Sequence, residues 1–83
     1  MSVSEPQKMT QTVVEIFKTN VNSEELADTI VFKLNQLYPK YRINFDLEDC
    51  DRVLRIESNT DVAVLGVIDY GKENAIHIEV IDY

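Results

Sequence analysis

The segment Tyr41–Glu57, YRINFDLEDCDRVLRIE, constrains the fold more than any other part of the chain. Apolar and polar residues alternate on both sides of a short acidic turn. The apolar positions are Ile43, Phe45, Leu47, Leu54 and Ile56. A period of two gives each strand one face toward a core and one face toward water. The segment therefore predicts a β-hairpin whose inner face contributes to the core.

The length of the chain, 83 residues, is enough for one domain. Residues 1–11 are polar and include Pro6, which predicts a flexible N-terminal segment followed by a single domain over residues 12–83. Hydrophobic residues make up 45% of the chain, too large a share for an intrinsically disordered protein. A core built from about 70 residues yields roughly 3–5 kcal/mol of net stability.

The charge of the chain limits its partners. It has 15 acidic and 8 basic residues, a net charge of −7, and its Lys and Arg residues are scattered singly. Nucleic acids and anionic membranes would be repelled, so we expect a protein partner or a weak homodimer. A single cysteine, Cys50, cannot form an internal disulfide, and no apolar signal segment is present. Both features are typical of a cytoplasmic protein.

The first half of the chain predicts a strand and a helix. Val13–Lys18 is rich in β-branched residues and alternates. A helix is expected from Ser23 to Tyr38, with Asn22 and Glu25 as a capping box and Pro39 as its stop. Its apolar face comprises Leu26, Ile30, Leu34 and Leu37, widened by Ala27, Val31 and Tyr38.

Asn59–Tyr70 carries opposing signals. Thr60 or Asn59 is able to cap a helix, and Asp61 would favour its positive end. Three valines and Gly66 favour a strand instead. The pattern alone leaves helix and strand open for residues 61–70.

The last segment, Ala75–Asp82, predicts a strand, and Gly71–Asn74 predicts a turn before it. If residues 61–70 are helical, the element order is βαββαβ. This is the ferredoxin-like α+β arrangement, a two-layer sandwich with two helices on one face of a four-stranded antiparallel sheet. Right-handed crossovers favour the strand order 4-1-3-2.

The motifs IFKTN and NFDLEDCDRVLRIES, in that order, resemble small bacterial proteins of the heavy-metal-associated, copper-chaperone-like superfamily, in a branch that lacks the metal-binding cysteines. The resemblance covers roughly residues 13–58. It implies the βαββαβ fold and favours the helix for residues 61–70. The superfamily binds metal through two cysteines in the loop after the first strand. Here that loop, Lys18–Ser23, has no cysteine, and soft monovalent copper needs sulfur ligands.

The acidic turn offers a weak metal candidate. Asp49, Cys50 and Asp51 could supply ligands, together with Asp46 and Glu48. Aspartates are common in exposed turns, and the spacing of a calcium-binding loop is missing. Carboxylates around the thiol also work against thiolate formation. We therefore assign no metal and no cofactor, and we interpret Cys50 as structural or incidental.

The sequence offers no catalytic residues that we can assign. No Ser/His/Asp set, phosphate-binding glycine loop or nucleotide motif appears. His77 has Glu79 and Glu15 as expected neighbours on the open sheet face but no nucleophile nearby by spacing. The residues expected on that face are Val13, Glu15, Phe17, Arg42, Asn44, Asp46, Arg55, Glu57, His77 and Glu79. One aromatic, Phe17, is too few for an RNA-binding sheet.

Phe32 is the odd residue of the predicted helix, because it projects away from the apolar face. With Phe17 it forms our set of interface candidates. The sequence thus predicts a non-enzymatic, cytoplasmic protein-interaction or self-association module, with a dimer that is weak and strengthened by salt. The alternatives are a metal-handling protein that uses Cys50 with the acidic turn, or a small-molecule sensor.

Overall fold

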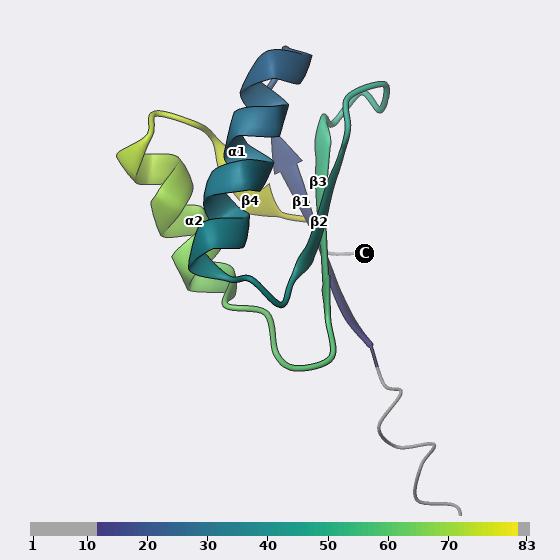
Figure 1. Ribbon diagram of the computed structural model, residues 1–83. Coiled ribbons are helices and arrows are strands. Elements are labelled where there is room, and N and C mark those ends of the chain that lie inside the picture. Colours follow the sequence, from purple (N-terminus) through teal and green to yellow (C-terminus); the bar gives the residue numbers. More distant parts are fainter. Residues whose placement is uncertain (1–11, 82–83) are drawn as a thin grey trace, which may run out of the picture.

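The computed structural model describes residues 12–81 of the chain (Figure 1). Its elements, in chain order, are β1 (Val13–Thr19), α1 (Glu24–Leu37), β2 (Arg42–Asp46), β3 (Val53–Ser58), α2 (Val64–Glu73) and β4 (Ile78–Val80). The strands pair antiparallel in the order β2-β3-β1-β4. Both helices lie against the same face of the sheet (Figure 1). This is the ferredoxin-like α+β fold that the sequence predicts, with the predicted strand order.

Two predictions fall partly outside this range. The flexible segment expected at residues 1–11 lies outside the described residues, as does Asp82 at the end of the last predicted strand. Within the range, β4 covers only Ile78–Val80, because Ala75 has a positive φ of 60° and the chain is not extended there. The predicted turn Gly71–Asn74 is mostly the end of α2.

Helix α1 begins one residue later than predicted. Ser23, not Asn22, is the N-cap, and its Oγ accepts a hydrogen bond from the Leu26 N–H at 3.2 Å. Serine and asparagine cap helices about equally well, so sequence could not choose between neighbours. Glu24 and Glu25 lie in the first turn, where their charges favour the positive end of the helix.

The buried face of α1 is narrower than the predicted one. Ala27, Ile30 and Leu34 are buried, whereas Leu26 and Leu37 are 40% and 59% exposed. Residues 27, 30, 31 and 34 all belong to the predicted apolar face and follow the helical period by themselves. The helix therefore packs through the side of the predicted face that carries Ala27, Ile30 and Leu34, and the assignment of Leu26 and Leu37 to the core was wrong.

Residues 64–73 form helix α2, which settles the ambiguous segment as the resemblance favoured. The predicted caps at Asn59 and Thr60 are wrong, because α2 starts after Ala63, which makes no side-chain cap. Tyr41, which is distant in the sequence, binds the backbone at the start of α2 instead. The Tyr41 hydroxyl accepts from the Ala63 N–H at 2.8 Å and donates to the Asp61 carbonyl at 3.2 Å. A tertiary contact thus replaces the local cap that the sequence suggested.

Strand β1 faces the other way from the prediction. Phe17 is fully buried and pairs with Leu54 on the inner face, so its placement on the open face was wrong. Both alternate sets of residues in VVEIFK contain apolar side chains, and burying a phenylalanine outweighs the cost of half-burying Glu15. The buried apolar residues are Phe17, Val21, Ala27, Ile30, Leu34, Ile43, Leu54, Ile56, Val62, Val67, Ile76 and Ile78.

Candidate functional site

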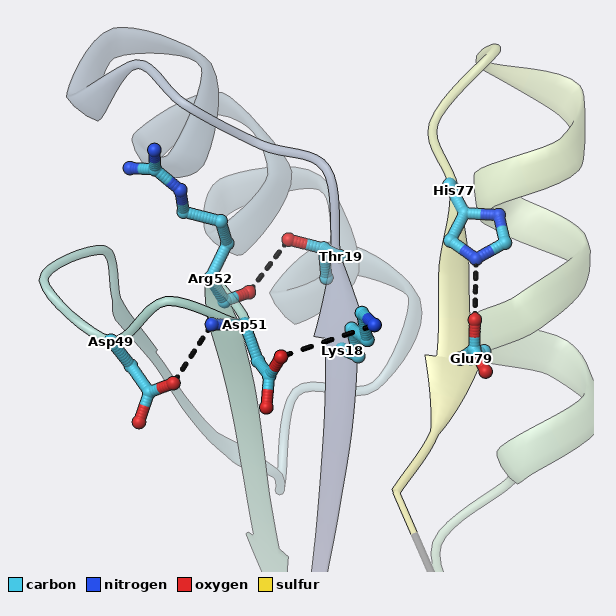
Figure 2. Close-up of polar contacts among 7 residues, drawn as sticks. All are labelled: Lys18, Thr19, Asp49, Asp51, Arg52, His77 and Glu79. Carbon is cyan, nitrogen blue, oxygen red and sulfur yellow. Dashed lines mark hydrogen bonds and ion pairs between the residues drawn. The ribbon is translucent and has the colours of Figure 1, made fainter.

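The acidic turn between β2 and β3 is fastened to the end of β1 (Figure 2). Thr19 is buried, and its hydroxyl donates to the Arg52 carbonyl at 2.7 Å and accepts from the Val21 N–H at 3.1 Å. The Thr19 N–H donates to the Asp51 carbonyl at 3.1 Å. These bonds hold the turn against the loop that leads into α1.

The turn brings the three metal candidates together. One possible ligand atom from each of Asp49, Cys50 and Asp51 lies within 4.8 Å of the others. Two of these groups already have partners: the Asp49 carboxylate accepts from the Asp51 N–H at 2.8 Å, and Asp51 lies 3.9 Å from the Lys18 ammonium. One thiol and two carboxylates on consecutive, largely exposed residues are a donor set that suits neither monovalent copper nor a structural zinc site.

His77 and Glu79 form a surface pair on the side of the sheet away from the helices. The His77 Nε2 lies 2.7 Å from the Glu79 Oε1, and both side chains are more than half exposed (Figure 2). This hydrogen bond, helped by nearby positive charge, lowers the pKa of the Glu79 carboxyl. Glu15, the other expected neighbour of His77, lies on the inner face beside Ile56 in the register, so that grouping was wrong.

The open sheet face carries the other set of β1 residues. Ile16 pairs with Arg55, which in turn pairs with Asn44, so these three side chains share one face. Arg55 binds Glu57 at 2.8 Å, and Arg42 lies 3.5 Å from the same carboxylate. With Phe17 buried, the expected aromatic is missing from this face, which is an apolar and ion-paired surface.

A groove with a volume of about 740 Å³ lies between α1 and the edge strand β2. We call it the α1–β2 groove. Its apolar lining residues are Ala27, Val31, Phe32, Ile43, Phe45 and Leu47. Phe32 is 61% exposed, and Val31, Phe45 and Leu47 are half-buried. The placement of Phe32 on the surface is thus confirmed, and it lies beside further accessible apolar side chains.

The charged residues that line this groove are all acidic: Glu24, Asp28, Asp46 and Glu48. Within residues 12–81, none of them forms an ion pair with a lysine, an arginine or a histidine. The remaining lining residues, Asn35 and Asn44, are neutral. The groove therefore combines an apolar floor with uncompensated negative charge.

Sequence reasoning identified one residue of this groove, Phe32, and missed the rest. The alternation of β2 assigned Phe45 and Leu47 to the core, and the predicted strand order placed β2 at an edge. These two signals together indicate apolar side chains beside an uncovered strand. The position of α1 relative to β2 was needed to see that Glu24 and Asp28 line the same groove as Phe32.

Within residues 12–81, no helix is both long and apolar enough to cross a membrane. The fold is consistent with heavy-metal-associated-like domains. No protein-family model matches the chain, and no curated protein matches it significantly.

Proposed function

We propose that the chain is a non-enzymatic protein-interaction domain that binds another protein through the α1–β2 groove. The observation that carries the proposal is Phe32, a large apolar side chain that is 61% exposed at the wall of a groove with further accessible apolar residues. An apolar centre ringed by polar groups is the usual composition of a protein interface. A large aromatic at such a centre often contributes most of the binding energy.

The proposal includes membership of the branch of the heavy-metal-associated superfamily that lacks the metal site. The βαββαβ order supports it, together with the absence of cysteine from Lys18–Ser23. A cytoplasmic location goes with it, because the chain has a single cysteine and gains nothing from an oxidising compartment.

Site-specific cross-linking in living cells tests this function. A photoreactive phenylalanine analogue replaces Phe32 in one variant and Leu65 in a matched control. Leu65 is 76% exposed on α2 and does not line the groove. We expect a discrete adduct from position 32 and none from position 65. An adduct of twice the mass of the chain would identify self-association, and equal adducts from both positions would contradict the proposal.

The second candidate is a metal-handling role, favoured by the proximity of Asp49, Cys50 and Asp51 within 4.8 Å. We rank it behind the first because these residues are largely exposed and partly engaged in local contacts. Titration with zinc and with monovalent copper, under reducing conditions and against a competing chelator, separates the two. One equivalent bound tightly, and lost in Cys50→Ala, would favour metal handling.

A further inference from the structure

The hydrogen-bond phase of the sheet shows which backbone groups of β2 point outward. In an antiparallel pair, residues alternate between those whose N–H and C=O face the neighbour and those that face away. The Ile81 N–H donates to the Ile16 carbonyl at 2.9 Å, so the backbone N–H and C=O of Ile16 point toward β4. The backbone N–H and C=O of the next residue, Phe17, therefore point toward β3, where Phe17 pairs with Leu54.

The same alternation carries across β3. Because the backbone groups of Leu54 point toward β1, those of Arg55 point toward β2, where Arg55 pairs with Asn44. Asn44 thus points its backbone groups toward β3, and Ile43 and Phe45 point theirs toward the open edge. Each of these two residues presents one N–H and one C=O to the side where the α1–β2 groove opens.

Both ends of this edge are closed by the protein itself. The Tyr41 N–H donates to the Tyr38 carbonyl at 3.1 Å, and the Tyr41 carbonyl accepts from the Asn35 side chain at 3.0 Å. At the other end, the Leu47 carbonyl accepts from Arg52 at 3.1 Å. Between them, the outward groups of residues 43 and 45 have no partner within residues 12–81. The free stretch is short and bounded, which suits one added strand.

The side chains of a strand added here would alternate between the two faces of the sheet. Residues opposite Ile43 and Phe45 would point to the helix side, toward Val31 and Phe32 in the groove. Residues between them would point to the open face, where Asp46 lies. Apolar side chains at alternate positions therefore fit the groove, with another residue type between them.

The negative charge beside the groove favours Lys or Arg at the positions between the apolar residues of the added strand. Asp46, which lies on the open face beside these positions, has no cationic partner among the described residues, so an incoming lysine or arginine gains an attraction that no internal pair already satisfies. A second copy of this chain would bring the four carboxylates of its own groove and a net charge of −7. The groove is thus better matched to a basic segment than to its own twin.

We propose that β2 accepts an extended, basic segment of another protein as a fifth strand, with alternate apolar side chains in the α1–β2 groove and Lys or Arg between them. This inference rests on the proposed function and adds its partner chemistry and its mode of binding. Strand addition of this kind takes affinity from main-chain hydrogen bonds and specificity from alternate side chains.

The probe is a seven-residue peptide, blocked at both ends, with lysine at odd positions and valine or leucine at even positions. The proposed register is antiparallel, like the other strand pairs of the sheet, so the amides of the apolar residues bond to Ile43 and Phe45. N-methylation of those amides should therefore weaken binding by about tenfold or more, whereas N-methylation of the lysine amides should change it by less than about threefold. The same peptide with glutamate in place of lysine should not bind.

Protein variants supply the second arm. Asp46→Lys, on the open face where the lysines of the added strand would lie, should weaken binding of the lysine peptide by about tenfold, and Glu73→Lys, on α2, should change it by less than about threefold at the same net charge. Binding is followed by NMR titration, with the amides of Ile43 and Phe45 as reporters. Equal effects of the two N-methylation patterns, or of the two lysine substitutions, would overturn the proposal.

The outcomes distinguish failure of the strand-addition proposal from failure of the proposed function. Cross-linking of another protein from position 32, with no response of the Ile43 and Phe45 amides to the lysine peptide, would overturn strand addition and leave the proposed function standing. A dimer in sedimentation whose Ile43 and Phe45 amides are already protected would assign the edge to a second copy and also overturn the basic-segment proposal. Response of the edge amides to the lysine peptide alone would support it.

Discussion

Thr19 offers the sharpest test of how the acidic turn is held. Its hydroxyl donates to the Arg52 carbonyl at 2.7 Å and accepts from the N–H of Val21, which is fully buried. Thr19→Val keeps the shape and the β propensity of the side chain but removes both hydrogen bonds. The Val21 N–H then remains buried without an acceptor.

The cost can be worked from these contacts. A buried donor left unsatisfied costs about 1–3 kcal/mol, and loss of the second hydrogen bond adds about 1 kcal/mol. The total, roughly 2–4 kcal/mol, compares with the ~3–5 kcal/mol expected for a domain of this size. Thr19→Ser keeps the hydroxyl and loses one methyl group, worth about 0.8 kcal/mol. The valine variant should therefore be the less stable of the two, the reverse of what apolar burial alone predicts.

Urea denaturation, followed by far-ultraviolet circular dichroism, measures both variants. With an m-value of about 1 kcal/mol per molar urea, the unfolding midpoint of Thr19→Val should fall by about half or more. Thr29→Val is the matched control. The Thr29 hydroxyl bonds the Glu25 carbonyl on the exposed side of α1, and its loss should cost less than about 0.5 kcal/mol. If Thr19→Val is at least as stable as Thr19→Ser, the hydroxyl does not hold the turn.

Three further predictions concern the core, a close approach and pH. Leu34→Ala should destabilise the domain by about 2–5 kcal/mol, because Leu34 is fully buried, and an unchanged melting temperature would contradict the assigned helix face. Gly71→Ala should be strongly destabilising in the same assay, since its Cβ would lie 2.7 Å from a backbone carbonyl, whereas Gly66→Ala would meet only the far end of a tyrosine side chain and should be nearly neutral. The hydrogen bond from His77 lowers the pKa of Glu79 from its ordinary 4.5, so the pair stabilises the fold above that pH and loses its contribution as the pH falls through the lowered value. A carboxyl titration by NMR should place the Glu79 midpoint below 4.5 and return it toward 4.5 in His77→Ala, and equal midpoints would refute the contact.

The elements that the sequence predicts well are those with strong local signals. The hairpin around residues 48–51 follows from strict alternation and an acidic turn, and α1 follows from its apolar period and Pro39. Helix α2 needed the resemblance as well, since its start is capped by the hydroxyl of Tyr41, 22 residues from Ala63 in sequence. A hydrogen bond between residues this far apart in the sequence produces no local sequence pattern from which the start of α2 could be predicted.

The errors in face assignment have one physical origin. In β1, either alternate set of residues could have been buried, and the packing of Phe17 against β3 decides between them. In α1, Leu26 and Leu37 are the larger apolar residues, yet Ala27 occupies the buried stripe beside the sheet. A one-residue shift of phase hardly changes a local pattern, so tertiary packing sets it.

The candidate site was predictable only in part, for the same reason. The exposure of Phe32 follows from its helix position, and the edge location of β2 follows from the strand order. Whether Asp28 shares a groove with Asp46 depends on the distance and tilt of α1 over the sheet. These quantities come from the packing of the whole core.

Amide hydrogen exchange along β2 in the free protein tests the central claim most directly. We expect slow exchange at Asn44, whose N–H faces β3, and fast exchange at Ile43 and Phe45, whose N–H groups face the open edge. Addition of the lysine peptide should slow Ile43 and Phe45 and leave Asn44 little changed. Slow exchange at all three residues in the free protein, at a concentration where it sediments as a monomer, would show that the edge is already covered and would contradict the account.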